Sequence, residues 1–361
     1  MTTRAGVVTT EATSGAPIPA NKGFHPIIER DHPYIFIDGC MQAWPDADFS
    51  AANQHGATAY AVTAWDPHAS FEAVVEGAMF WHLVARRHPN ILVAERADDI
   101  RRAKREGKAA LVLAAQGGDW VGFKLHRVEA LYRLGLRMML FAYNRTNQLC
   151  DGCLDRTNDG LSRFGQLVVD ECNRVGMLID CTHIGRRASL DIIERSSQPV
   201  VFSHSNPKAV ADNPRNIDDE QIQSCVARGG VIGLCTWGPI VQRKGRTSRP
   251  TVEDFVDHVD YVAHLTGSTD HIGIGTDMSL GTYPDHWHDP WGEPDYPSPS
   301  AAYDEQISAD VRSPLRAIEG FDSYPQILNL IDHLLERGYS DEDVHKILGE
   351  NFLRVFGQVW R

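Results

Sequence analysis

Two histidines that each close a short apolar run carry the strongest chemical signal in this sequence. His183 ends the run MLIDCTH that begins at residue 177, and His204 ends the run PVVFSH that begins at residue 199. Asp277 ends a third run, HIGIGTD. Two imidazoles and a carboxylate can bind a divalent metal and leave a position for water, whose pKa the metal lowers. These three residues therefore predict metal-assisted hydrolysis.

The elements that must position these residues alternate between strands and helices. Near-continuous apolar runs predict eight strands, at residues 35–40, 58–65, 109–116, 137–144, 177–183, 199–205, 230–237 and 271–277. Apolar residues at three- and four-residue spacing predict helices at 71–87, 98–106, 124–134, 164–175, 188–196, 219–228 and 252–265. Eight such units predict an α/β fold, a (β/α)8 TIM barrel with its active site at the C-terminal ends of the strands. A doubly wound open sheet is the alternative, but no glycine-rich phosphate loop follows the first strand.

The domain organisation follows from the same pattern. We expect a single barrel domain over residues 25–361, preceded by an arm at 1–24 that is loose or bound at an interface. The segment 278–316 is rich in Pro, Trp, Tyr, Asp and His, and long irregular loops are usually functional. It is expected to cover the active-site mouth or to form an interface. Three helices, at 324–337, 341–348 and 351–358, are expected to end the chain.

The remaining strand ends complete the predicted rim. They bring polar or aromatic residues to the same edge as the histidines, namely Cys40, Gln42, Trp65, Asp66, Gln116, Tyr143, Asn144, Thr236 and Trp237. Trp120 follows shortly after Gln116 and is expected to line the mouth. A lone strand-end histidine can be a buried structural residue, but two on consecutive strands with a carboxylate on the last favour a functional site.

Composition narrows the class of protein. A formal net charge of -13 disfavours non-specific binding to nucleic acid or to an anionic membrane. Residues 1–24 lack the apolar core of a secretory signal, and seven cysteines, an odd number, favour reduced thiols in a cytoplasmic protein. Cys150 and Cys153 form a lone CxxC pair, which without a second pair is weak evidence for a metal or redox site.

Several stretches together resemble the membrane (renal) dipeptidase family, the M19 metallopeptidases of the amidohydrolase type. They are GLSRFGQLVVDECNRVGMLIDCTHIG (160–185), PVVFSHSNPKAVADNPRN (199–216), GGVIGLCTW (229–237), HIGIGTDMSLG (271–281) and ENFLRVFGQV (350–359). The resemblance covers about residues 35–360 and implies that His183 and His204 ligate one zinc of a pair. It also implies that Asp277 transfers protons and that Arg215 binds the substrate carboxylate. Tyr143 stands where the family has a histidine that steadies the oxyanion, and the family's dimers imply a homodimer or higher homo-oligomer.

Three departures from the family pattern fall on the second metal. The family's first strand ends in Asp-Gly-His-x-Asp, whereas this chain has Cys40 and Gln42 at the two ligand positions. Gln116 replaces the glutamate that bridges the two ions. A neutral amide compensates little charge and offers only its carbonyl oxygen. We therefore expect one divalent metal, zinc, rather than a dinuclear site.

Three functions remain open at this point. The first is hydrolysis of an amide or peptide bond in a small carboxylate-bearing substrate, with Asp277 and Tyr143 catalytic and with Arg215, Asn144, Gln116, Trp120 and Cys40 around the substrate. The second is metal-free acid–base chemistry on an amino-acid-like metabolite. The third is a non-catalytic binding homologue or partner subunit. Cys40, or His286 and His288 in the long loop, are candidate replacement ligands.

Overall fold

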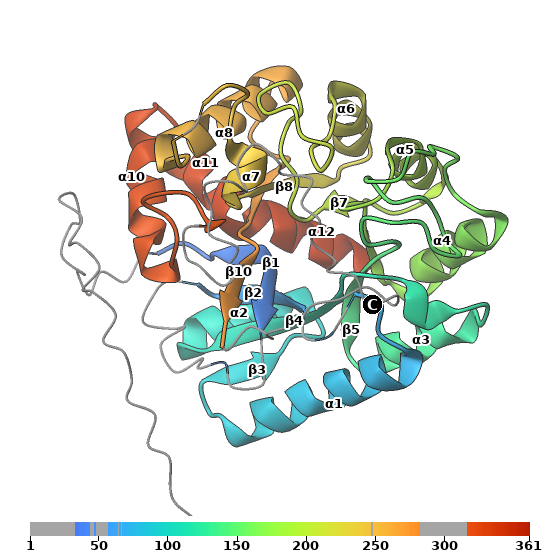
Figure 1. Cartoon of the computed structure of the whole chain (residues 1–361). Coiled ribbons are helices and arrows are strands. Elements are labelled where there is room, and N and C mark those ends of the chain that lie inside the picture. The colour runs from blue at the N-terminus through green and yellow to red at the C-terminus, as the bar shows by residue number, and fades with distance from the viewer. Residues whose placement is uncertain are drawn as a thin grey trace, which may run out of the picture. The chain divides into compact units, whose positions relative to one another are not determined.

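Eight parallel strands form a closed barrel that the helices surround (Figure 1). The computed structural model describes residues 33–43, 57–63, 67–246, 248–281 and 316–361, with positions 47 and 65. The barrel strands are β1 (Ile37–Ala43), β2 (Ala59–Thr63), β4 (Ala109–Ala115), β5 (Leu136–Leu140), β6 (Leu178–Asp180), β7 (Val201–Phe202), β8 (Val231–Cys235) and β9 (Ile272–Gly275). Each pairs with the next in this order, and β1 pairs with β9 to close the ring. The predicted TIM barrel is confirmed.

Helices surround the barrel, and all of them except α7 lie where the sequence predicted a helix. They are α1 (Phe71–Arg87), α2 (Ala97–Glu106), α3 (His126–Arg133), α4 (Arg163–Val175), α5 (Arg186–Arg195), α6 (Asp219–Ala227), the short α7 (Gly238–Val241) and α8 (Val252–Thr266). Ser162 and Thr251 cap α4 and α8, each accepting a hydrogen bond from the backbone amide three residues on. Gly176 and Gly267 end the same two helices in the left-handed conformation that favours glycine.

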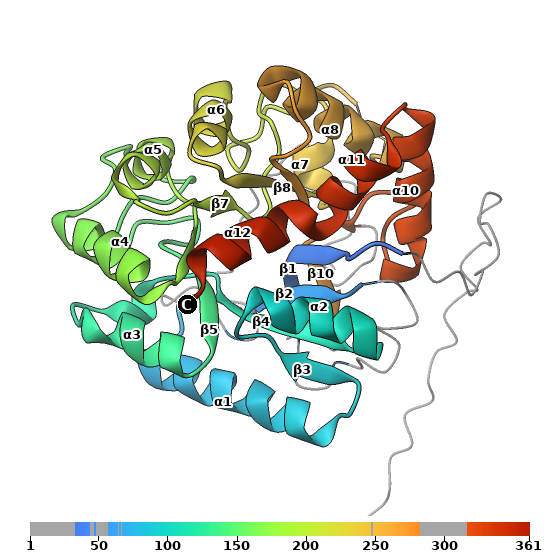
Figure 2. The ribbon, with the colours of Figure 1, turned by 180° about the vertical axis from the view of Figure 1, so that it is seen from behind.

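The barrel interior is narrow and is closed at one end by the C-terminal helix. Small inward residues such as Ala61, Ala110 and Ala114 leave room there for Phe352 of α12 (Asn351–Val359). Figure 2 shows α12 lying across the end of the barrel. A Cβ on Gly39 would lie 2.7 Å from the Phe352 ring, so β1 must carry a glycine at this point. Because α12 fills this end of the barrel, the active site is expected at the opposite rim, at the C-terminal ends of the strands.

The structure adds short elements that the sequence did not predict. β3 (Ile91–Val93) pairs with β4 outside the ring, and β10 (Met278–Leu280) pairs with β1. β10 occupies the start of the segment expected to be an irregular loop, because its residues extend the edge beside β1. α10 (Ile327–Glu336) and α11 (Asp341–His345) precede α12, and a π-helical turn at Lys346–Glu350 joins the last two. The arm at 1–24 and loop residues 282–315, with His286 and His288, lie outside the described residues.

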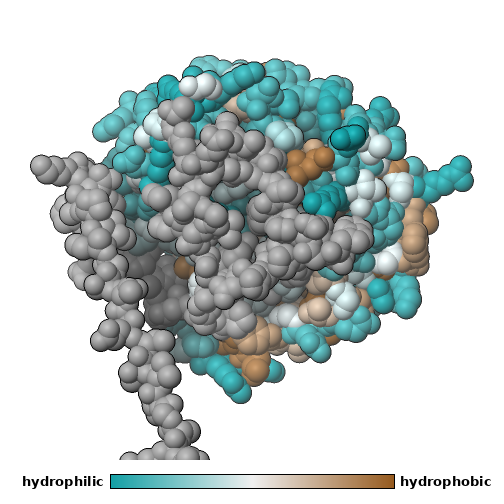
Figure 3. Space-filling model, viewed as in Figure 1, coloured by the Kyte–Doolittle hydropathy of each residue, from teal (hydrophilic) through white to brown (hydrophobic). Residues whose placement is uncertain are grey.

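The surface agrees with the acidic, polar composition. Figure 3 shows a mainly hydrophilic face over α6 and α8, with hydrophobic residues along the lower edge. Large exposed apolar side chains among the described residues include Met79 and Phe123. Within this part of the chain, no helix combines the length and apolar character needed to cross a lipid bilayer.

Candidate active site

Three residues at the strand ends hold a strained backbone. Asn144, His183 and Asp277 have φ values of 60°, 66° and 56°, and they are the non-glycine residues with positive φ in the described chain. They follow β5, β6 and β9 within four residues of the strand end. A left-handed conformation costs an ordinary residue about 1–2 kcal/mol, and such strain clusters at functional sites. The fold therefore maintains these conformations at the rim where the sequence predicted the chemistry.

The two predicted metal ligands meet in the centre of this rim. His183 Nε2 lies 2.9 Å from His204 Nε2, and both side chains are buried. The Nδ1 atom of each ring forms a hydrogen bond with a neighbouring side chain. His183 Nδ1 lies 2.7 Å from Asn144 Oδ1, and His204 Nδ1 lies 2.7 Å from Ser203 Oγ. Each imidazole is thus fixed by a partner on the side away from the other ring.

The hydrogen bonds fix the tautomer of both rings. Asp180 accepts from the backbone amides and hydroxyls of Thr182 and Ser203, so the Ser203 proton is committed to this carboxylate. Ser203 Oγ must then accept from His204 Nδ1–H, and the carbonyl oxygen of Asn144 likewise accepts from His183 Nδ1–H. Both Nε2 atoms are left with lone pairs that face each other. This is the donor arrangement of a metal-binding histidine pair with its supporting partners.

Neither His183 nor His204 is protonated, so no imidazolium proton lies between the two rings. Burial lowers the pKa of His183 well below its usual value, and the nearby Arg215 and His204 lower it further. Burial and Arg215 lower the pKa of His204 in the same way. Both imidazoles are therefore neutral at physiological pH, which is the protonation state that ligates a metal. The residues of β6 and β7 fit a divalent ion.

On the opposite half of the rim, the amides of Gln116 and Gln42 donate hydrogen bonds to the other candidate ligands. Gln116 Nε2 donates to Cys40 Sγ at 2.7 Å, and Gln42 Nε2 donates to Asp277 Oδ1 at 3.0 Å. Burial raises the pKa of the Cys40 thiol well above its usual value, and Asp277 raises it further. Donor atoms of Cys40, His204 and Asp277 do lie within 4.8 Å of one another. These residues provide one carboxylate, which does not fit a second divalent ion.

Asp38, the first-strand carboxylate, ties the rim together. It accepts hydrogen bonds from Cys40 N at 3.1 Å, Thr276 N at 2.8 Å and the Tyr324 hydroxyl at 2.7 Å. Burial raises the pKa of Asp38 to about 6, although these hydrogen bonds by themselves lower it. Asp38 therefore orients the end of β1 by hydrogen bonding. Tyr324 was not singled out from the sequence, because it lies 286 residues away along the chain.

Arg215, which the sequence predicts to bind the substrate carboxylate, lies directly beside the histidines. Its side chain is 4% exposed, and Nη2 lies 3.3 Å from His183 Nε2 and 3.4 Å from the His204 carbonyl oxygen. No carboxylate of the described residues forms an ion pair with it. A buried unpaired charge is costly, so a guanidinium in this setting favours an anionic ligand.

The structure separates the other predicted substrate contacts. The Tyr143 ring lies 4.2 Å from the His183 ring, measured between centroids, which places Tyr143 at the centre of the cluster. Asn144, expected beside the substrate, instead has its side-chain oxygen engaged by His183. Trp120, expected at the mouth, is 1% exposed and packs in the hydrophobic core. The turn Asp119–Val121 directs it inward, between helices, after the strand has ended.

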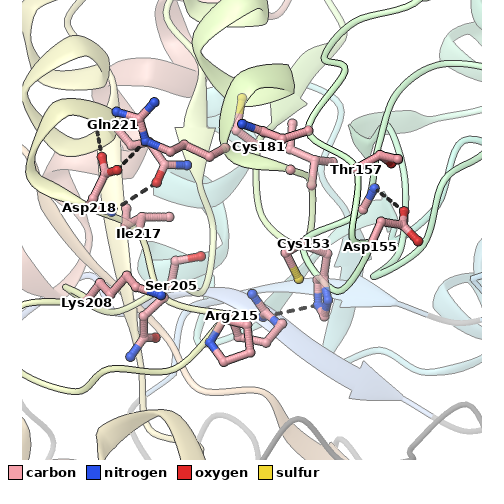
Figure 4. Close-up of a pocket in the computed structure, with 18 of the residues that line it drawn as sticks. Cys153, Asp155, Thr157, Cys181, Ser205, Lys208, Arg215, Ile217, Asp218 and Gln221 are labelled. Carbon is pink, nitrogen blue, oxygen red and sulfur yellow. Dashed lines mark hydrogen bonds and ion pairs between the residues drawn. The ribbon is translucent and has the colours of Figure 1, made fainter.

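A cavity lies on one side of this cluster, between the loops that follow β5, β6 and β7 (Figure 4). Its volume is about 300 Å³, and of the histidine cluster only His183 and Arg215 line it. Cys153 also lines it, and burial raises the pKa of this thiol to about 11 despite the opposing effect of Arg215. The second half of the lone CxxC pair is therefore a protonated thiol beside the site.

Sequence reasoning passed over two residues that hold the histidines. The strand-end pattern singles out neither Asp180 nor Ser203. Both sit within three residues of a strand-end histidine, and a carboxylate inside an otherwise apolar strand was the available signal. Their contact crosses between two strands and therefore required the three-dimensional structure.

Comparisons with known proteins agree with this geometry. The model of the membrane dipeptidase family, peptidase family M19, matches residues 46–296 and 307–361. The dipeptidase tcpJ of Claviceps purpurea (strain 20.1) is 30% identical over 269 residues, covering 74% of this chain and 55% of that protein. The chain thus spans about half the length of this curated relative.

Solved structures share the same barrel. An amidohydrolase from Pseudomonas aeruginosa superposes with a TM-score of 0.79 at 28% identity, over 91% of this chain and 97% of that one. The probable dipeptidase PvdM of the same organism gives 0.72 at 21% identity, over 91% and 96%, which supports the fold alone. The strand-end histidines, the closed barrel and the family match lead to one conclusion: this chain belongs to the membrane dipeptidase family, peptidase family M19.

Proposed function

We propose that this protein is a hydrolase with a single divalent metal, zinc, which cleaves an amide or peptide bond in a small carboxylate-bearing substrate. His183 and His204 would hold the ion. The observation that supports this most is the pair of facing Nε2 lone pairs, 2.9 Å apart, with both Nδ1 protons committed elsewhere. Two neutral rings held in this way repel each other unless a cation lies between or beside them.

A bound divalent ion would polarise the scissile carbonyl and activate water. The protein supplies the remaining chemistry. Burial raises the pKa of Asp277, while Arg316, Gln42 and Arg215 partly lower it again. A carboxylate poised in this way can accept a proton and return it to the leaving nitrogen. Its bond from Gln42 fixes which oxygen stays free for that task.

Two further residues would bind the substrate. Tyr143, whose ring packs against His183 at a tilt of 30°, is the candidate donor to the oxyanion that develops at the carbonyl, where a hydrogen bond has its largest effect on rate. Arg215 would bind the substrate carboxylate, because its buried charge has no carboxylate partner among the described residues. Arg215 Nη2 already lies 3.3 Å from His183, so a carboxylate bound there lies close to the ion.

The test is metal content followed by turnover. Protein purified without a metal-affinity tag is measured by elemental mass spectrometry, and dipeptides and N-acyl amino acids are then screened for hydrolysis. About one ion per chain with cleavage supports the proposal. Two ions would refute the mononuclear site. No ion after incubation with zinc, manganese or iron would refute the hydrolase.

A metal-free enzyme is the competing candidate, and one contact favours it. Arg215 Nη2 can donate to the lone pair of His183 Nε2 at 3.3 Å, which would reduce the repulsion between the two rings without an ion. Asp277 and Tyr143 would then act as the acid–base groups. Treatment with a chelator distinguishes the two functions, because only the hydrolase loses activity when the ion is removed.

A further inference from the structure

Two buried aspartates hold the rim in the same way on two pairs of neighbouring strands. Asp180 of β6 accepts hydrogen bonds from the backbone amide and the hydroxyl of Ser203, which directly follows β7. Asp38 of β1 accepts from the backbone amide of Thr276 at 2.8 Å and from its hydroxyl at 2.5 Å, and Thr276 directly follows β9. In both pairs the hydroxyl residue lies two positions beyond the strand partner of the aspartate. The same contact is therefore built twice, in the same register.

Each of the two hydroxyl residues directly precedes a residue of the proposed chemistry. Ser203 precedes His204, and its hydroxyl oxygen accepts a hydrogen bond from His204 Nδ1–H at 2.7 Å. Thr276 precedes Asp277, the proposed proton-transfer group. The contact between β6 and β7 thus positions a metal ligand, and the contact between β1 and β9 has the corresponding place next to the carboxylate.

Three consecutive backbone amides fix the turn that carries Asp277. The amide of Thr276 donates to Asp38, and the amide of Asp277 donates to the carbonyl oxygen of Cys40 at 2.8 Å. The amide of Met278 donates to the Thr276 hydroxyl oxygen at 3.0 Å. Asp277 has a φ of 56°, and a non-glycine residue keeps such a conformation only where its surroundings fix it. The Thr276 hydroxyl contributes twice to this restraint, as a donor to Asp38 and as an acceptor from Met278.

Tyr324 completes the contact at the end of β1. Asp180 accepts a further hydroxyl hydrogen bond from Thr182, two residues along the chain. The corresponding residue after Asp38 is Cys40, which has no hydroxyl. The Tyr324 hydroxyl donates to Asp38 at 2.7 Å instead, and Tyr324 is only 6% exposed, so this bond is shielded from water. The C-terminal segment therefore supplies a donor that the β6–β7 pair obtains locally.

We infer that Thr276 and Tyr324 are positioning residues for proton transfer by Asp277. Through Asp38 they hold Asp277 in its left-handed conformation, which places a carboxylate oxygen within 4.8 Å of a ring nitrogen of His204. The effect on turnover rests on the proposed hydrolase, whereas the conformation of Asp277 does not. The two contacts have separate consequences, because the β6–β7 contact supports metal affinity and the β1–β9 contact supports kcat.

Two substitutions of similar shape test Thr276. Thr276→Val keeps the branched side chain but removes both hydroxyl hydrogen bonds, whereas Thr276→Ser keeps both. Thr276→Val should lower kcat about 100-fold, as expected for a reacting group that moves by about 1 Å, with KM and metal content unchanged. Thr276→Ser should restore kcat to near the parent value. Circular dichroism checks that both variants fold.

A matched pair of tyrosine variants tests Tyr324. Tyr324→Phe keeps the ring and should lower kcat about tenfold, through the loss of one hydrogen bond to a charged group. Tyr34→Phe is the control, because Tyr34 is also 6% exposed and donates to a carboxylate, that of Asp341 on α11. Equal kcat in the two variants would overturn the positioning role of Tyr324.

Crystal structures of the parent, Thr276→Val and Thr276→Ser provide a readout that needs no turnover. In Thr276→Val, Asp277 is expected to leave the left-handed region or to lose its hydrogen bond from Gln42, whereas Thr276→Ser should keep both features. An unchanged Asp277 in Thr276→Val, equal kcat in the two Thr276 variants, or loss of the ion from Thr276→Val would overturn the inference. If the parent hydrolyses no substrate, the proposed function fails, and the conformation of Asp277 in these structures alone decides whether Thr276 positions it.

Discussion

Both halves of the rim are built from the ends of parallel strands, but only one of them presents the converging Nε2 atoms of two histidines. On the β6–β7 side, Asp180, Ser203 and Asn144 hold two imidazoles so that both lone pairs converge. On the β1–β4 side, Gln116 and Gln42 donate hydrogen bonds to the groups that could have been ligands. Whether a strand end can bind a metal therefore depends on the hydrogen-bond partners of its side chain as much as on the type of that side chain.

The strongest test removes the converging lone pairs. We expect His183→Ala/His204→Ala to lose the bound ion and all detectable hydrolysis, because these two rings supply both converging lone pairs. Elemental mass spectrometry and kcat/KM measure the two losses. Gln116→Ala, on the opposite half, should keep about one ion per chain. Loss of the ion in Gln116→Ala would show that the two halves bind it together.

Asp277→Asn tests the carboxylate that lies between the halves. Removing a general acid–base group should lower kcat by about 10²–10⁴, while the ion is retained. The amide can still accept the hydrogen bond from Gln42, so the rim should keep its shape. Asp332→Asn, an exposed change on α10, is the matched control. Unchanged kcat would remove Asp277 from the proton-transfer role.

A smaller effect is expected from the group that supports His204. Ser203→Ala removes the acceptor for His204 Nδ1–H and should lower metal affinity by about 10–100-fold. Competition with a fluorescent chelator measures that affinity. Ser189→Ala is the control, since Ser189 is equally buried and hydrogen-bonded but does not touch the histidines. Equal affinities of the two variants would mean that Ser203 does not support the metal site.

The smallest expected effect is the binding of one additional metal ion by a variant of the β1–β4 half. The triple variant Cys40→His, Gln42→Asp and Gln116→Glu gives the β1–β4 half the ligand types of its family. We expect the stoichiometry to rise from about one ion per chain to about two, because the new carboxylates compensate the second charge. Gln116→Glu alone should remain near one. A triple variant that still binds one ion would show that the backbone of this half has also changed.

Strand ends were predictable from the sequence, whereas side-chain partners were not. Because the C-terminal ends of parallel strands meet at one rim, the positions of His183, His204 and Asp277 alone predicted their proximity. The burial of Trp120 was not predictable in this way, since Trp120 follows its strand by several residues and lies in a 3-10 turn. The pairing of Gln42 with Asp277 joins β1 to the residue after β9, 235 positions away, and depends on rotamers that no local pattern encodes.

The left-handed conformations at His183 and Asp277 set a limit on how this protein can be improved. Glycine adopts that conformation freely, so His183→Gly or Asp277→Gly would remove about 1 kcal/mol of backbone strain at each position. Neither variant would retain its imidazole or carboxylate. Selection for thermal robustness alone would therefore enrich inactive chains, and directed evolution of this scaffold needs a screen that rewards turnover at every round.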